Sequence, residues 1–234
     1  MLLPGLLQLI WPSLCVACDA PTIEEQPLCD LCAQSLEPIV QACRQCGIPL
    51  APGEFERPAV SCLACGASAP HWTSARSPFL FGGQLAVAVR RWKFGRRPEL
   101  TRSLAQLLAP SLAELPAAVD VLVPVPLHPR RLRQRQFNQA SLLARAAQRN
   151  GPPVRELLDR VRDTPPQTRL GATERRANVR NAFAMARRAN VKDLHLVLVD
   201  DVMTTGATAE ACARVCFRAG AARVDVLTLT RAPL

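Results

Sequence analysis

Residues 195–208, HLVLVDDVMTTGAT, constrain the fold of this chain more than any other stretch, because an apolar run ends there in two carboxylates. Residues 197–199 are uninterruptedly apolar, which is typical of a central parallel strand that is covered on both faces. Asp200 and Asp201 would then fall at the carboxyl end of this strand, the edge where open α/β sheets hold ligands. The sequence therefore predicts an α/β domain with a binding crevice at this edge.

The loop that follows the two carboxylates has the composition of an anion site. It runs from Thr204 to Thr208, contains three threonines, and leads into an alanine-rich helix that is expected to end near Ala219, before Gly220. Hydroxyls and backbone N–H groups at a helix N-terminus favour a phosphate, while the acids upstream can bind vicinal hydroxyls or a hydrated Mg²⁺. A ribose 5-phosphate satisfies both halves. Simple helix capping would not require adjacent acids and three hydroxyls.

Eight of the ten cysteines form four Cys-x-x-Cys pairs before residue 66. Two thiolates at this spacing reach one tetrahedral metal ion, and two such pairs close a structural Cys₄ site. Pairing in chain order is entropically easier than interleaved pairing, which stays possible. A disulfide scaffold would need an oxidising compartment. In chain order the zinc ligands are Cys15, Cys18, Cys29 and Cys32 for one ribbon and Cys43, Cys46, Cys62 and Cys65 for the other, with one or two structural zinc ions.

Charge divides the 234 residues unevenly. Residues 1–75 contain two basic and seven acidic residues, a net charge of −5. Because the whole chain has a net charge of +10, the remaining residues carry +15. A basic body suits anionic partners such as a sugar phosphate, pyrophosphate or nucleic acid, without choosing among them. The apolar start lacks the basic region and cleavage site of a signal peptide and is too short for a membrane span. We expect a cytoplasmic protein without a membrane span.

Several further segments are expected to join the same domain. A helix that carries Arg90, Arg91 and Lys93 should break at Gly95, and a second, amphipathic helix should cover residues 100–115. A buried strand is expected to run from Val119 into the proline-constrained loop Val123–Pro126. An arginine-rich stretch over 130–135 should precede a helix that extends to about Asn150. The polar segment over 164–178 is typical of a mobile flap.

The combination of these features resembles the ComF family, which includes ComFC-type competence proteins and GntX. VLVDDVMTTGAT matches the phosphoribosyl pyrophosphate (PRPP) motif of type I phosphoribosyltransferases, and the other marks follow a Cys-rich start in the family's order: KFG at 93–95, VPVPLHPRR at 123–131, RQFNQAS at 135–141 and TPPQTRLGATERRANVRNAF at 164–183. The resemblance implies an α/β, type I phosphoribosyltransferase-like fold (Rossmann-like, a mostly parallel sheet with flanking helices) over 76–234. It also implies a small zinc-ribbon module over 1–75.

The same resemblance implies roles for individual residues. The acid pair would hold the ribose hydroxyls, the threonine loop the 5-phosphate, and the proline loop with nearby arginines the diphosphate and its Mg²⁺. The residues assigned to PRPP are Val123, Pro124, Val125, Pro126, Arg130, Arg131, Asp200, Asp201, Val202, Met203, Thr204, Thr205, Gly206, Ala207 and Thr208. Those assigned to catalysis are Asp200, Asp201 and Arg135, and those assigned to the flap are Gln167, Arg175 and Asn178. His128, beside the proline loop, is a further ligand candidate.

Two hypotheses for function follow. The first is a transferase that moves the phosphoribosyl group of PRPP to an unknown acceptor. The second is a non-catalytic protein of the same fold that senses PRPP or binds single-stranded DNA, with DNA-uptake proteins as partners. The aromatic residues best placed to stack on bases are Trp72, Trp92, Phe94 and Phe137.

The chain departs from the family's usual pattern at two positions. Gln136 stands where the family commonly has Gly, and Phe81 occupies a position that is usually Tyr.

Overall fold

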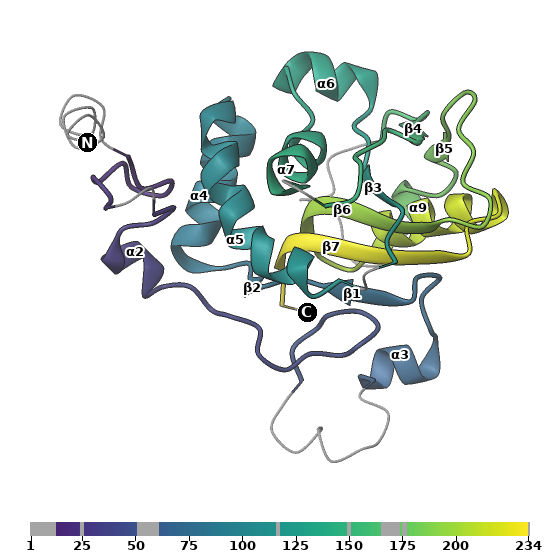
Figure 1. The fold of residues 1–234 in the computed structure, drawn as a ribbon, viewed down its shortest axis with the longest axis horizontal. Coiled ribbons are helices and arrows are strands. Elements are labelled where there is room, and N and C mark those ends of the chain that lie inside the picture. The colour runs from purple at the N-terminus through teal and green to yellow at the C-terminus, as the bar shows by residue number, and fades with distance from the viewer. Residues whose placement is uncertain are drawn as a thin grey trace.

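A parallel sheet forms the centre of the computed structural model, which describes residues 13–23, 26–50, 61–115, 118–148, 151–164, 174 and 177–233. The strand order is β1–β7–β6–β3, and β2 pairs with β7 beyond the end of β1 (Figure 1). All of these pairs are parallel, which confirms the mostly parallel α/β fold. The strands are β1 (Ser74–Arg76), β2 (Phe79–Leu80), β3 (Val121–Pro124), β6 (His195–Met203) and β7 (Arg223–Arg231).

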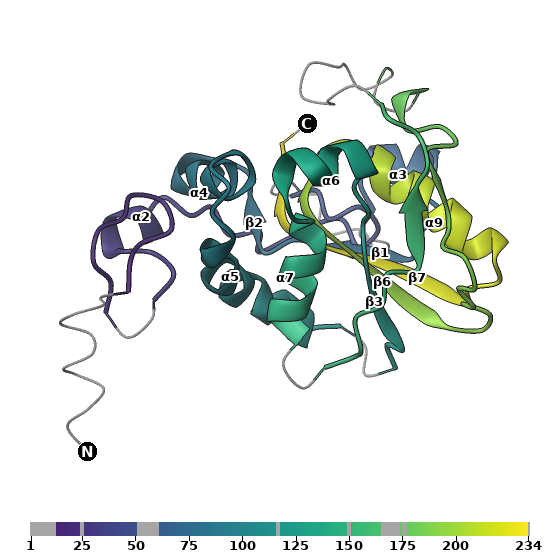
Figure 2. The ribbon, with the colours of Figure 1, turned by 90° about the horizontal axis from the view of Figure 1, so that it is seen from above.

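Helices cover both faces of this sheet. They are α4 (Gly83–Phe94), the 3₁₀ turn Pro98–Leu100, α5 (Thr101–Ala113), α7 (Gln139–Gln148) and α9 (Ala207–Arg218). In β6, Val197 and Val199 pack with α4, α5 and α7, whereas Leu196 and Leu198 pack with α9. Figure 2 shows these helices on opposite sides of the sheet. Burial on both faces explains the uninterrupted apolar run. No helix in the described ranges has the length and apolarity to cross a bilayer.

Two short antiparallel strands, β4 (Leu158–Arg160) and β5 (Phe183–Met185), form a pair that we call the hood. Val154 lies beside Leu122 of β3 in a parallel bridge. The hood packs against α9, because Leu158 and Phe183 belong to the same core cluster as Cys212. The expected flap connects its two strands in sequence. Gln167 and Arg175 lie outside the described residues, and Asn178 is half-buried just before β5.

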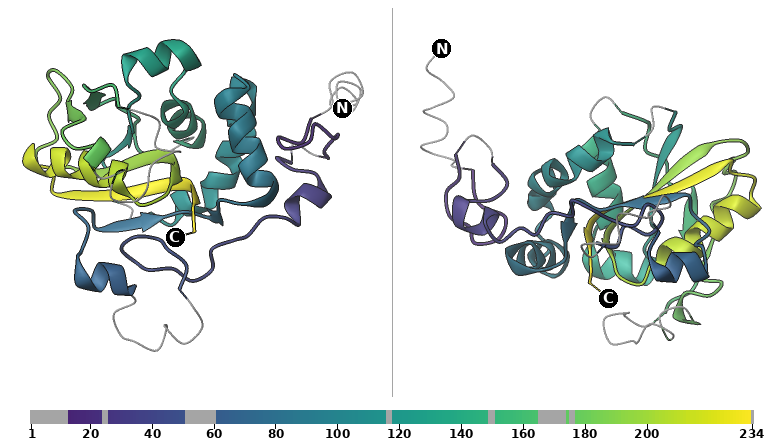
Figure 3. Two further views of the ribbon diagram at one scale, coloured as in Figure 1. Left: turned by 180° about the vertical axis from the view of Figure 1, so that it is seen from behind. Right: turned by 90° about the horizontal axis from the view of Figure 1, so that it is seen from below.

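The two halves of the Cys-rich region pack in different places. The first, which includes α2 (Asp30–Ala33), contacts α4, where Arg91 donates a 2.6 Å hydrogen bond to the Ala17 carbonyl. The second, which includes α3 (Leu63–Ala67), lies along the β1 side of the sheet (Figure 3). Each half is therefore attached to the α/β domain separately. The proposed boundary at residue 75 falls within β1.

The arginine-rich stretch forms a helix of its own, α6 (Pro129–Arg135), rather than only preceding one. His128 caps it, because its Nδ1 accepts a 3.3 Å hydrogen bond from the Arg130 N–H. Gln136 ends it in the left-handed conformation, with φ of +70° and a 2.7 Å hydrogen bond from its N–H to the Leu132 carbonyl. The position at which the family commonly has Gly is thus a helix C-cap that favours glycine.

Replacing Gln136 with Gly is expected to raise the free energy of unfolding by about 0.5–1 kcal/mol, because glycine adopts a positive φ without steric cost. Thermal unfolding at fixed zinc concentration measures the change. The matched control is Gln134→Gly within α6, which should lower stability by about 1 kcal/mol. A melting temperature that falls in both variants would contradict this account of the cap.

Candidate functional site

The carboxyl end of β6 and the first turn of α9 enclose a cavity of about 40 Å³. This volume has room for about two or three water molecules or a group of similar size. Its lining includes Val125 of the proline loop, Asp200, and Thr204, Gly206 and Thr208 of the threonine loop. The structure thus brings together three segments that were selected from the sequence. The first turn of a helix presents N–H groups that suit an anion, and one of them, the Ala207 N–H, donates to the Thr205 hydroxyl at 3.4 Å.

Gly206 gives the threonine loop its shape. Its φ is +76°, and a Cβ atom there would lie 2.8 Å from the ring of Trp72. Trp72 is 6% exposed, and its Nε1 donates a 2.6 Å hydrogen bond to the Gln45 carbonyl. The loop therefore requires glycine both for its backbone conformation and for its close packing against an indole that is anchored in the second Cys-rich half.

The two acids point to opposite faces of β6, because consecutive side chains alternate along a strand. Asp200 lines the cavity beside α9. Asp201 is 6% exposed and forms a 2.7 Å ion pair with Lys93, at the end of α4 on the other face. Of the two, Asp200 alone is among the residues that line the cavity, so a shared role on one ribose stays a prediction.

The carboxyl group of Asp200 is held in an unusual electrostatic state. Burial, together with the neighbouring Asp201 carboxylate, raises the pKa of Asp200 to about 7, and the positive charge of Lys93 opposes this shift. A carboxyl group that titrates near neutral pH is typical of functional sites. Lys93 belongs to the KFG motif, but no local pattern in the sequence pairs it with the two acids.

A buried arginine fixes the start of the threonine loop. Arg231, 2% exposed at the end of β7, donates from Nη1 to the carbonyls of Met203 (3.1 Å) and Thr204, and from Nε to the Cys46 carbonyl (3.2 Å). One guanidinium thus connects the second Cys₄ group to the loop. Sequence reasoning missed Arg231, because an arginine at the end of a strand carries no local signal.

The arginines of α6 have partners around the proline loop. Arg130 forms a 3.1 Å ion pair with Asp163, and Arg131 donates to the Thr164 carbonyl. Arg135 donates to the Gln139 side chain at 3.2 Å, and its guanidinium lies 5.2 Å from the Phe94 ring centroid. In the proline loop itself, Val123 is 0% exposed in the core, Pro124 ends β3, and Val125 lines the cavity.

The eight cysteines form two Cys₄ groups in chain order, as expected, and not interleaved groups. Within each group the sulfur atoms lie within 4.8 Å of one another. The distances between Cys18 and Cys29 Sγ (3.7 Å) and between Cys46 and Cys62 Sγ (3.6 Å) agree with the roughly 3.8 Å separation that 2.3 Å Zn–S bonds imply in a tetrahedron. Four sulfur donors without an open position fit structural zinc.

One thiol in each group is prepared to bind metal as thiolate. Burial opposes ionisation of Cys15 and Cys43, but hydrogen bonds from backbone N–H groups outweigh it and lower the pKa of each to about 7. The Cys62 N–H, 3.3 Å from the Cys43 Sγ, is one such donor. Because zinc binds the thiolate form, these N–H groups favour metal binding.

Known proteins are similar to this chain both in its Cys-rich region and over nearly its whole length. Residues 6–66 match the double zinc ribbon domain family. DNA utilization protein YhgH of Salmonella typhimurium is 35% identical over 231 residues, covering 94% of this chain and 97% of that protein. Competence protein F of Haemophilus influenzae is 30% identical over 230 residues, covering 93% and 96% of the two chains. Competence protein ComFC of Bacillus subtilis is 30% identical over 158 residues, covering 67% and 63%.

The chain also has a weaker similarity to solved structures. A purine phosphoribosyltransferase from Pyrococcus horikoshii superposes with a TM-score of 0.33 and 19% identity, covering 56% of this chain and 72% of that one.

Proposed function

This chain belongs to the ComF family of competence and DNA utilization proteins, and on that premise we propose that its α/β domain binds PRPP with Mg²⁺. The observation that carries the proposal is the cavity in which Asp200 faces the glycine-kinked threonine loop and the first turn of α9. A carboxylate and a helix N-terminus, separated by one small cavity, suit a ligand that has both hydroxyls and a phosphate.

In this proposal the 5-phosphate lies against the residues from Thr204 to Thr208, and a ribose hydroxyl donates to Asp200. The ion pair between Asp201 and Lys93 holds the end of β6 in place, and the positive charge of Lys93 balances the negative charge of Asp201. The diphosphate lies toward the proline loop, whose Val125 already reaches the cavity. The carboxylates of Asp200 and Asp201 would hold Mg²⁺, and this ion would neutralise part of the ligand's charge.

Transfer to an acceptor follows if a nucleophile reaches C1 of the bound ribose. Its lone pair forms the new bond at C1 while the bond from C1 to the diphosphate oxygen breaks and its electrons leave with the diphosphate. Positive charge develops on the ribose, so Asp200 stabilises it, and Arg130, Arg131 and Arg135 stabilise the departing anion.

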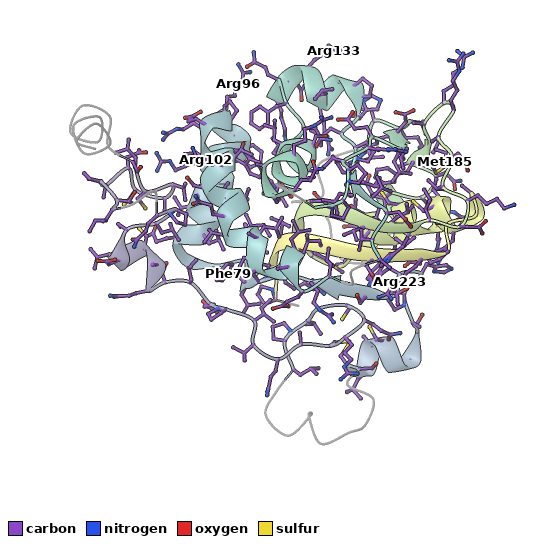
Figure 4. All side chains as sticks on the ribbon, viewed as in Figure 1. Phe79, Arg96, Arg102, Arg133, Met185 and Arg223 are labelled. Carbon is purple, nitrogen blue, oxygen red and sulfur yellow. The ribbon has the colours of Figure 1, made fainter. Side chains whose placement is uncertain are left out.

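A second candidate function, binding of single-stranded DNA, is favoured by one surface. Phe94 is 64% exposed, and Arg135 stacks over it. Arg96 and Arg133 project from the same end of the molecule (Figure 4). An exposed ring among arginines is the combination that binds bases and phosphates together. Trp72 and Trp92, also expected as stacking residues, are only 6% and 0% exposed, so that prediction was wrong for both.

Calorimetry with PRPP and fluorescence anisotropy with a labelled oligothymidylate separate the two functions. PRPP binding should require Mg²⁺ and change little with NaCl, whereas DNA binding should weaken steeply with salt, by about 100-fold or more between 50 and 200 mM for a site with several phosphate contacts. Release of pyrophosphate in the presence of candidate bases tests transfer. Absence of PRPP binding at millimolar Mg²⁺ would contradict the first function.

PRPP affinity is expected to rise as pH increases through about 7, because the raised pKa of Asp200 keeps this acceptor protonated below that value. If only the carboxylate binds, affinity changes by about tenfold per pH unit below the pKa. Calorimetry from pH 5.5 to 8.5 measures the profile. Asp200→Asn is the control, since it retains only the titration of the ligand's own phosphates. Identical profiles for the two proteins would contradict the role of Asp200.

A further inference from the structure

The hood contains a buried cation that forms no direct ion pair within the described residues. Arg160, at the end of β4, is 7% exposed. Its Nη2 donates a 2.6 Å hydrogen bond to the Thr164 hydroxyl, and its guanidinium lies 5.4 Å from the Phe183 ring centroid. Its Nε is buried and has no hydrogen-bond partner in the part of the chain that the structure describes. A buried charged donor without a partner is costly unless a ligand satisfies it.

A second arginine meets the first at the same residue. Arg131 of α6 donates to the carbonyl of Thr164, whose hydroxyl accepts from Arg160. The two guanidinium groups therefore converge on Thr164 from separate elements. Their mutual repulsion, added to burial, opposes the charged form of Arg160 and lowers its pKa.

Asp163 acts on both arginines, and Asp200 on Arg160, only through longer-range charge interactions, without a direct ion pair. Asp163 forms its 3.1 Å ion pair with Arg130, and its other oxygen lies 3.7 Å from His128 Nδ1. Within the described residues neither Arg131 nor Arg160 forms an ion pair. Among the described residues, the buried Nε of Arg160 thus remains a donor for an anion from outside the chain.

The pair lies on the ligand side of the sheet. Leu158 and Phe183 of the hood pack in the core cluster that includes Cys212 of α9, and Figure 4 shows Met185, the last residue of β5, above the sheet. Asp200 is close enough to Arg160 to interact with it electrostatically. An anion held here would therefore lie near the reacting end of a ligand in the Asp200 cavity.

We propose that Arg131 and Arg160 form an anion subsite around Thr164 that binds a carboxylate or phosphate group next to the PRPP cavity. This inference rests on the proposed function and extends it. The planar donor forks of two arginines match the oxygens of such a group. The anion is supplied either by the diphosphate of PRPP or by the acceptor, which would then belong to the anionic bases rather than the neutral ones.

Calorimetry on Arg160→Gln tests the subsite with three probes: inorganic pyrophosphate with Mg²⁺, orotidine 5′-monophosphate, and uridine 5′-monophosphate, which lacks only the base carboxylate. Loss of two charge-assisted hydrogen bonds is expected to weaken one anionic probe by about tenfold or more. A loss for pyrophosphate identifies the diphosphate as the source. A loss of affinity for orotidylate that is not seen for uridylate identifies the acceptor as the source of the anion. The matched control is Arg162→Gln, which replaces an exposed arginine two residues further on. It should not change the affinity for pyrophosphate or for either nucleotide.

Three results would overturn the subsite. The first is wild-type affinity for pyrophosphate and orotidylate in folded Arg160→Gln. The second is an equal loss for both nucleotides with pyrophosphate unchanged. The third is failure of the wild-type protein to bind both pyrophosphate and orotidylate. If circular dichroism shows that Arg160→Gln does not fold, Arg160→Lys decides by the same criteria, because lysine keeps the positive charge but lacks the planar donor fork. Unchanged PRPP binding that still depends on Asp200 would separate failure of the subsite from failure of the proposed function.

Discussion

Replacing Asp200 and Asp201 together with Asn is expected to lower PRPP affinity by at least about 100-fold and to leave zinc content unchanged. The change removes the carboxylate that lines the cavity and breaks the 2.7 Å ion pair with Lys93, whose side chain is only 16% exposed. Loss of a charged hydrogen-bond acceptor at a buried ligand contributes about 1.5–3 kcal/mol, and the orphaned lysine adds to it. Calorimetry and a metal assay on the same preparations measure both quantities.

The single variants resolve the two carboxylates. Asp200→Asn should account for the larger loss, because Asp200 lines the cavity, whereas Asp201→Asn should act through the position of the strand end. Asp193→Asn makes the same chemical change at an exposed position ahead of β6 and serves as the control. Wild-type affinity in the double variant would remove the basis for the site.

Replacing Cys43 and Cys46 with Ser is expected to remove one zinc ion per chain and to weaken PRPP binding as well. A Cys₄ site contributes about 10 kcal/mol or more of apparent metal-binding free energy, so two lost thiolates empty it. The carbonyls of Gln45 and Cys46 anchor Trp72 and Arg231, which hold the threonine loop. Loss of the metal should therefore loosen the loop at the α9 N-terminus.

The first Cys₄ site supplies the matched control for this coupling. Cys15→Ser with Cys18→Ser should also remove one zinc ion per chain. Its effect on PRPP affinity should be several-fold smaller, because this half packs on α4 through Arg91 and makes no hydrogen bond to the loop among the described residues. Full zinc content in either variant would contradict zinc binding by the cysteines that it replaces. Equal losses of PRPP affinity in the two variants would contradict the coupling between the second Cys₄ site and the threonine loop.

Local patterns made part of this structure predictable. The apolar run at 197–199, followed by acids, threonines and glycine, predicted β6, the loop and α9 because each follows from residues close in sequence. Chain-order grouping of the cysteines was predictable for the same reason, since short loops close at low entropic cost. The opposite directions of Asp200 and Asp201 could have been anticipated from the period of two in a strand.

Long-range contacts account for what the sequence did not reveal. Arg231 reaches Cys46 across 185 positions, and Arg160 meets Arg131 through Thr164, so neither leaves a local signal. Trp92 was expected at the surface, but its place on α4 directs it into the core, where its Nε1 donates to the Thr101 hydroxyl at 3.0 Å. Burial of this kind depends on how α4 and α5 pack.

A crystal structure of the protein with Mg²⁺ and PRPP tests the central claim most directly. The account predicts the 5-phosphate against the first turn of α9, within hydrogen-bond distance of backbone N–H groups between Thr204 and Thr208, and a ribose hydroxyl within the same distance of an Asp200 oxygen. PRPP bound elsewhere, with the cavity between β6 and α9 free of ligand, would contradict it.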